Sequence, residues 1–210
     1  MAIVKKSIKE QVYEEIRNRI ITREYTPGSV LNISRLSEEL GVSNSPIREA
    51  LAMLAKEDLL TIVANSKYKV VELDENLLQQ VDAALVSVLI GAARLCFKMD
   101  KVDELAVNLE KAYAKQCDNH EQISLKDRYW LAMDFDKEIV KLTENDLIMK
   151  DFENLASLLY FSTSLTDAAY ENSVVEHKAI LEAVKEKDYL KVVEALEDHL
   201  IKHFLPEERD

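Results

Sequence analysis

The feature that most constrains this fold is helical periodicity, which runs almost without interruption from residue 74 to the end of the chain. Apolar residues recur every three or four positions there in six segments, at 74–99, about 100–118, 124–143, 145–165, 171–187 and 189–204. The chain has only three glycines and three prolines. An all-β fold needs many such turn residues, so the composition favours helix. Six helices with short connections predict an antiparallel all-α bundle.

Residues 1–73 follow a different order, which ends in strands. A helical segment at 7–22 is followed by a turn at Pro27-Gly28 and by a short helix that ends at Gly41. A further helix then starts near Ser43, and β-rich runs at 60–63 and 68–72 form a hairpin. A short helix, a tight turn, a second helix and a hairpin make a winged helix-turn-helix. We therefore predict a mostly α protein with two domains, 1–73 and 74–210.

Charge divides along the same boundary. The net charge is −12, which argues against contact between the whole chain and nucleic acid. Residues 1–71, however, carry 11 Lys and Arg against 9 Asp and Glu, whereas the remainder carries 16 against 30. An acidic body is repelled by phosphates, but a slightly basic N-terminal domain can still dock on them. The asymmetry indicates two domains with different partners.

The start of the second helix of this motif has an unusual polar composition. Ser43 can act as the N-cap, and Asn44, Ser45 and Arg48 follow on the outer face. In a helix-turn-helix this helix enters the major groove N-terminus first, where small hydroxyl groups allow a close approach to phosphates and arginine can read guanine. A capped surface helix would explain one serine but not the whole set. The pattern favours binding to double-stranded DNA.

These residues also carry a family resemblance. The segment "IKEQVYEEIRNRIITREYTPGSVLNISRLSEELGVSNSPIREALAMLAKEDLL" resembles the winged helix-turn-helix of the GntR family of bacterial transcription regulators. Its "PGSVL" turn, "LSEELGVS" and "SPIREAL" occur in the family's order. The resemblance implies DNA contacts near the first helix of the motif, along the recognition helix and at the tip of the wing, namely Ser34, Arg35, Ser43, Asn44, Ser45, Arg48, Asn65, Ser66 and Lys67.

The C-terminal part is similar, more weakly, to the helical effector domain of the FadR-like (FCD) branch, through "FDKEIVKLTENDLI" and "EHKAILEAVKEKDYLKVVEALEDHLIKHF". Many such domains hold a divalent metal on an Asp, a His four residues later and two later His. His177 and His199 match the last two positions, but Ala132 and Asp136 stand where the first two belong. The reduced set Asp136, His177 and His199 offers one oxygen and two nitrogens, which suits Zn or Ni if waters complete the shell.

Two other interpretations of these histidines stay open. His199 and His203 are four residues apart on one helical face and form a local alternative pair. The histidines can also be hydrogen-bonded members of the bundle core with no metal.

The sequence thus predicts a regulator, with two alternatives. The leading hypothesis is a cytoplasmic, homodimeric repressor that binds a palindromic operator and responds to a small-molecule effector. The second is a constitutive DNA-binding regulator with a degenerate effector site. A metallohydrolase with Glu176 as its base is the third, but no nucleophile-plus-base set and no phosphate loop occurs in the sequence, so we predict no enzyme. No 18-residue apolar run and no secretory signal are present, so no membrane span is expected.

Overall fold

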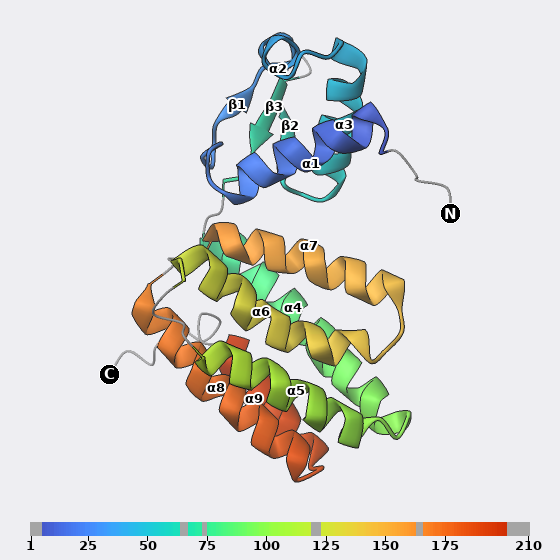
Figure 1. Cartoon of the computed structure of the whole chain (residues 1–210), viewed down its shortest axis with the longest axis vertical. Coiled ribbons are helices and arrows are strands. Elements are labelled where there is room, and N and C mark those ends of the chain that lie inside the picture. The colour runs from blue at the N-terminus through green and yellow to red at the C-terminus, as the bar shows by residue number, and fades with distance from the viewer. Residues whose placement is uncertain (1–5, 64–66, 73–74, 119–122, 163–165, 201–210) are drawn as a thin grey trace. The chain divides into compact units, whose positions relative to one another are not determined.

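The computed structural model describes residues 6–63, 67–72, 75–118, 123–162 and 166–200 (Figure 1). The contacts divide the chain into two compact units, Met1–Asp74 and Glu75–Asp210. The first unit combines helices with a small sheet, and the regular elements described in the second are all helices. The predicted mostly α fold, with a winged helix-turn-helix followed by a helical bundle, is therefore confirmed.

The described part of the first unit holds three helices and three short strands. In chain order they are α1 (Ile8–Ile21), β1 (Val30–Leu31), α2 (Ile33–Leu40), α3 (Asn44–Lys56), β2 (Leu60–Val63) and β3 (Lys67–Val70). The strands form an antiparallel sheet in the order β1-β3-β2, in which Leu31 and Ile62 both pair with Tyr68. The β2–β3 pair is the predicted wing. β1 was not predicted, because a strand of two residues has too few positions to show an alternating pattern.

Local sequence chemistry sets both ends of α2, the first helix of the motif. The Asn32 side chain accepts a hydrogen bond from the backbone N–H of Arg35 at its start, and Gly41 adopts a left-handed conformation (φ 64°) at its end. The end at Gly41 was predicted, and asparagine is among the residues preferred at an N-cap. The chain can therefore turn sharply from α2 into α3.

The core of this unit lies between α1, α2 and α3. α3 packs against both other helices, and Ile16, Ile20, Ile47 and Leu51 are fully buried. The Tyr13 hydroxyl donates to the carboxylate of Glu57, just after α3, at 2.8 and 2.9 Å. These contacts fix the axis of α3, so its inner face is apolar and its outer face remains available.

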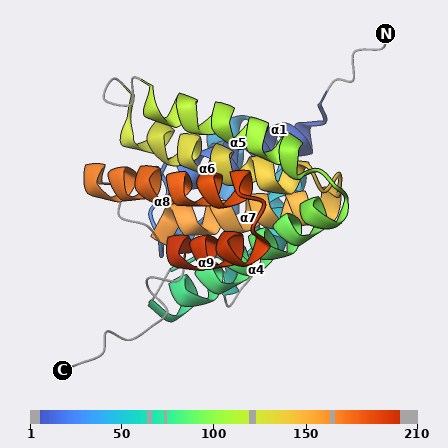
Figure 2. The ribbon, with the colours of Figure 1, turned by 90° about the horizontal axis from the view of Figure 1, so that it is seen from below.

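The residues of the second unit that the structure describes form a closed ring of six helices, which Figure 2 views from below. They are α4 (Glu75–Lys98), α5 (Val102–Cys117), α6 (Leu125–Lys141), α7 (Asp146–Ser162), α8 (Asp167–Lys185) and α9 (Tyr189–Leu200). Contacts run around the ring in the order α4, α9, α8, α5, α6, α7 and back to α4, and α6 also contacts α4 and α8. α6 therefore faces the interior, where helices distant in sequence meet.

Helix α4 is long and apolar enough, by length and composition, to cross a membrane. In this structure it contacts α6, α7 and α9, and it buries Leu85, Leu89 and Cys96 completely. It also carries the buried, charged side chain of Asp82. These contacts are those of a core helix in a helical bundle.

One predicted helix boundary was wrong. The pattern placed the start of the fifth bundle helix at residue 171, but α8 begins at Asp167. The Thr166 side chain accepts a hydrogen bond from the backbone N–H of Ala169 at 3.1 Å. This N-cap stabilises a polar first turn that has no apolar periodicity to reveal it.

Gly41 provides a test of the turn between α2 and α3. A Cβ added there would meet no atom within 4 Å, so only the positive φ opposes a side chain. We expect Gly41→Ala to lower the free energy of unfolding by about 1 kcal/mol, and Gly41→Asn to lower it less, because asparagine tolerates the left-handed region. Chemical denaturation measures both.

Gly91→Ala is the matched control. Gly91 lies inside α4 without a positive φ, and its added Cβ would also meet open space. Alanine is the better helix former, so this variant should gain about 0.5–1 kcal/mol. Equal effects of alanine at Gly41 and Gly91 would show that backbone conformation does not control the turn.

Candidate DNA interface and metal centre

The N-terminus of α3 lacks a side-chain cap. Ser43 occupies the N-cap position with extended backbone, as predicted, but its hydroxyl makes no capping hydrogen bond. At the N-caps of α1, α2, α6 and α8, the side chain accepts a hydrogen bond from a backbone N–H; these residues are Ser7, Asn32, Ser124 and Thr166. The N-cap of α5, Lys101, makes no such bond, but α3 differs from α5 in carrying a serine there whose hydroxyl could accept one. The backbone N–H groups in the first turn of α3 thus receive no cap from Ser43, and the positive end of the helix dipole can bind an external anion such as a phosphate.

The predicted DNA contacts that the structure describes lie at exposed positions. Buried Leu36 and Ile47 hold the opposite faces of α2 and α3 in the core. The exposed set consists of Ser34 and Arg35 on α2, Ser43, Asn44, Ser45 and Arg48 at the start of α3, and Lys67 on β3. Asn65 and Ser66 lie outside the described residues. The contacts of all these side chains with DNA stay predictions.

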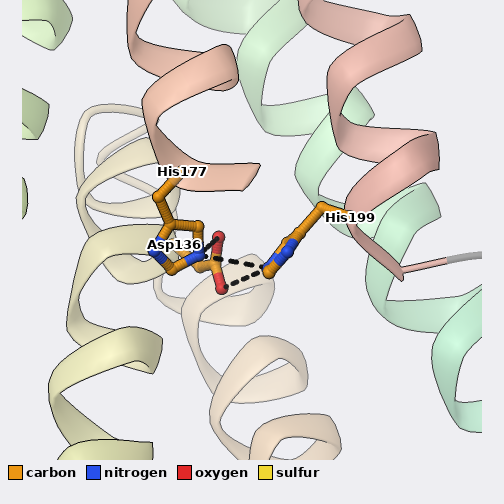
Figure 3. Close-up of side chains that lie close together, drawn as sticks. All are labelled: Asp136, His177 and His199. Carbon is orange, nitrogen blue, oxygen red and sulfur yellow. Dashed lines mark hydrogen bonds and ion pairs between the residues drawn. The ribbon is translucent and has the colours of Figure 1, made fainter. Parts of the chain in front are cut away.

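In the second unit, three predicted metal ligands meet inside the bundle (Figure 3). Asp136 comes from α6, His177 from α8 and His199 from α9, and one ligand atom of each lies within 4.8 Å of the others. The two Nε2 atoms are 3.1 Å apart. His177 Nε2 lies 3.7 Å from Asp136 Oδ1, and His199 Nε2 lies 3.6 Å from Asp136 Oδ2. We call these three residues the triad.

The triad is shielded from solvent. Asp136 and His177 are fully buried, and the side chain of His199 is only 6% exposed. The His177 ring stacks on Phe135, with centroids 4.1 Å apart and planes inclined by 9°. Neither carboxylate oxygen of Asp136 has a hydrogen-bond partner among the described residues. A buried carboxylate is costly unless a cation compensates it, so this geometry calls for positive charge between the three side chains.

A proton on His199 can supply that charge. Burial alone would lower the pKa of His199, but the carboxylates of Asp136 and Glu176 outweigh it and raise the pKa to about 9. Burial lowers the pKa of His177 well below its usual value, and the neighbouring His199 lowers it further. His199 is then the donor and His177 the acceptor of the hydrogen bond between the two Nε2 atoms. This shared proton occupies the space between the ligand atoms.

A metal ion matches the same space. An ion with tetrahedral bonds of about 2.0–2.1 Å holds its ligand atoms about 3.3–3.4 Å apart, close to the distances of 3.1, 3.6 and 3.7 Å within the triad. Ala132, one turn before Asp136 on α6, is buried and offers no ligand atom. The described residues therefore provide three ligands, and the local alternative with His203 lies outside them.

Two further side chains hold the histidines and differ in how visible they are in the sequence. Glu176 adjoins His177 in the chain, and its Oε2 lies 2.7 Å from His199 Nδ1. That contact engages the carboxylate that a metallohydrolase would have used as its base. Gln116 on α5 places Oε1 2.7 Å from His177 Nδ1, and sequence reasoning missed it. A glutamine 61 positions away from its partner has no spacing signal.

Comparison with known proteins identifies the family. The model of the "Bacterial regulatory proteins, gntR family" matches residues 8–70, and that of the "FCD domain" matches residues 87–202, which is more than half of the chain. The chain belongs to the GntR family, in its FCD branch. The predicted family is therefore confirmed.

Proteins that are similar to this GntR protein over most of its length are named as transcriptional regulators. An uncharacterized HTH-type transcriptional regulator, YdhC of Bacillus subtilis (strain 168), is 26% identical over 203 residues, or 92% of this chain and 86% of that protein. The gluconate operon transcriptional repressor of Bacillus licheniformis is 26% identical over 83% of this chain and 74% of that protein. A solved structure of a putative GntR regulator from Rhodococcus sp. RHA1 shares the fold, with a TM-score of 0.69 at 18% identity. The match covers 95% of this chain and 98% of that chain. The protein is a DNA-binding transcription regulator, and the prediction that it is no enzyme is confirmed.

The charge state of the two histidines can be measured directly. In protein stripped of metal, we expect NMR titration to show a pKa of about 9 for His199 and a neutral His177 down to acidic pH. A pKa for His199 near its ordinary 6.5 would contradict the charge assignment.

The raised pKa of His199 also makes the free energy of unfolding depend on pH. Because the folded pKa of His199 lies above its unfolded value, its contribution is fully present below pH 6.5 and is lost as pH rises through about 9. The difference in unfolding free energy between the wild type and His199→Gln should therefore shrink across that window.

Proposed function

We propose that this regulator is a cytoplasmic, homodimeric repressor that binds a palindromic operator through α3 and responds to a small-molecule effector in its helical unit. The observation that carries the DNA-binding part is the start of α3. It combines an uncapped N-terminus with the exposed side chains of Asn44, Ser45 and Arg48. The name of the gluconate operon repressor from Bacillus licheniformis supports repression as the mode of action.

The proposed docking follows from the faces of α3. Its apolar face, with Ile47 and Leu51, is held by the core, so its N-terminal end is the part available to the major groove. Backbone N–H groups and the Ser43 hydroxyl contact phosphates there, and Arg48, one turn further, contacts a base edge. Two copies related by a twofold axis would read half-sites about one helical turn apart.

We propose that the triad binds a divalent cation, Zn or Ni. The buried carboxylate without hydrogen bonds, the two imidazoles and the distances between them support this assignment. A dication with three protein ligands keeps coordination positions for water or an effector. Because the ligands come from α6, α8 and α9, occupancy of the centre favours one arrangement of three helices over others. An effector that binds one arrangement more tightly than another shifts the population toward it. The change in DNA affinity is then set by the difference between the effector's binding free energies for the two arrangements.

A constitutive regulator with a degenerate centre is the second candidate. Ala132, which supplies no ligand where the family carries an Asp, is the observation that favours it. Metal binding by the triad separates this candidate from the first.

Arg48 tests the DNA interface. We expect Arg48→Ala to weaken binding to a palindromic probe from the protein's own promoter by about tenfold or more at fixed salt, since a bidentate base contact contributes about 1–3 kcal/mol. Fluorescence anisotropy measures the affinity. Lys56→Ala, at the opposite end of α3, removes the same charge from an exposed position and should have little effect. Equal losses in the two variants would mean that α3 does not approach DNA with its N-terminus.

Calorimetric titration of metal-free protein tests the triad. We expect Zn(II) or Ni(II) to bind at micromolar concentration or more tightly, and His177→Gln and Asp136→Asn each to weaken that binding at least tenfold, because each removes a ligand. His203→Gln is the control that separates the triad from the local pair, and it should bind normally. No heat with either ion at micromolar protein would reject the metal centre and favour the constitutive candidate.

A further inference from the structure

Behind His177, on the side away from Asp136, a chain of hydrogen bonds connects α8 with α5. The Ser173 hydroxyl donates to the backbone carbonyl of Tyr170 at 2.7 Å. Gln116 Nε2 donates to Ser173 Oγ at 3.0 Å, and Gln116 Oε1 lies 2.7 Å from His177 Nδ1. Gln116 and His177 are both fully buried. Water therefore cannot replace either partner, and the directions of these hydrogen bonds are coupled.

The chemistry of the donors fixes those directions. A carbonyl can only accept, so the single hydroxyl proton of Ser173 is directed to Tyr170. Ser173 Oγ must then accept from its other neighbour, and only the amide nitrogen of Gln116 can donate to it. This sets the orientation of an amide whose oxygen and nitrogen have nearly the same shape. Gln116 Oε1 therefore faces His177 and accepts the hydrogen of Nδ1.

We propose that Gln116 is a positioning residue that holds His177 in the Nδ1–H tautomer and so directs the Nε2 lone pair toward Asp136 and His199. A neutral imidazole has one lone pair, and its place depends on the partner of the other nitrogen. The tautomer follows from the hydrogen bonds alone, whereas its use in cation binding rests on the proposed metal centre.

Glu176 acts on the other histidine in the same way. Its Oε2 lies 2.7 Å from His199 Nδ1, and a carboxylate can only accept there. The Nδ1 atoms of both histidines are thus occupied, and both Nε2 atoms are left facing each other across 3.1 Å. Gln116 and Glu176 together aim two potential ligands at one point, as residues behind metal-bound histidines generally do.

A purely structural role for Gln116 predicts a different outcome. Its backbone carbonyl also accepts from the Tyr170 hydroxyl at 2.7 Å, so this residue joins α5 to α8 regardless of any tautomer. Tyr170→Phe removes that contact and leaves the chain through Ser173 intact. This variant therefore serves as the matched control for lost packing between the two helices.

The first experiment reads the tautomer in metal-free protein from the ¹⁵N shifts of the His177 ring. We expect Nδ1–H in the wild type, in Tyr170→Phe and in Gln116→Glu, whose carboxylate still accepts. Above pH 9, where His199 is neutral and no longer donates to His177 Nε2, Gln116→Leu and Ser173→Ala should populate Nε2–H, because the first removes the acceptor and the second releases the amide to turn. An Nε2–H wild type, or unchanged ring shifts in both of these variants, overturns the proposal. The wild-type spectrum decides the assignment even if Gln116→Leu fails to fold.

The second experiment titrates the same proteins with Zn(II). We expect Ser173→Ala and Gln116→Leu to bind about 10–100-fold more weakly than the wild type, and Gln116→Glu and Tyr170→Phe to remain within a few-fold of it. Equal affinities throughout would overturn the positioning role. Absence of Zn(II) binding by the wild type would instead reject the proposed metal centre, while the ring shifts would still test the tautomer.

Discussion

The carboxylate of Asp136 lies fully buried inside a helical bundle, without a hydrogen-bond partner among the described residues. Two imidazoles from α8 and α9 face it at 3.6 and 3.7 Å, which is beyond hydrogen-bond length. A buried charge of this kind requires a compensating cation. A proton on His199 or a metal ion can fill that role, and each draws α6, α8 and α9 toward the same point. The bundle thus has a centre whose charge depends on what occupies it.

The DNA-binding unit is organised by a different principle, the separation of an apolar face from a polar end on one helix. Ile47 and Leu51 bind α3 to the core, and the contact between Tyr13 and Glu57 holds the far end of α3 to α1. The start of α3 is left without a side-chain cap, with exposed Arg48 one turn further. The part of the helix that holds the fold together is therefore separate from the exposed end proposed to contact DNA, so a substitution at that end should leave the core packing unchanged.

Features that are set by residues close together in the sequence could be predicted, whereas features that are set by contacts between distant segments could not. Gly41 acts on its own neighbours, and the hairpin consists of two β-rich runs on either side of a short turn, so both were predictable. The order and spacing of Asp136, His177 and His199 were visible through the family pattern, and the fold brings them together. β1 and Gln116 were not predictable, because a two-residue strand exists through its pairing with β3 and a lone glutamine gains its role from a partner on another helix.

X-ray absorption of the Zn(II)-loaded protein tests the central claim, that the triad is a cation site, most directly. We expect two imidazole nitrogens and additional oxygens, from Asp136 and water, at about 2.0–2.1 Å. Loss of one imidazole contribution in both His177→Gln and His199→Gln would assign the nitrogens to the triad. A spectrum with sulfur ligands, with oxygen ligands alone, or with an unchanged shell in both variants would contradict it.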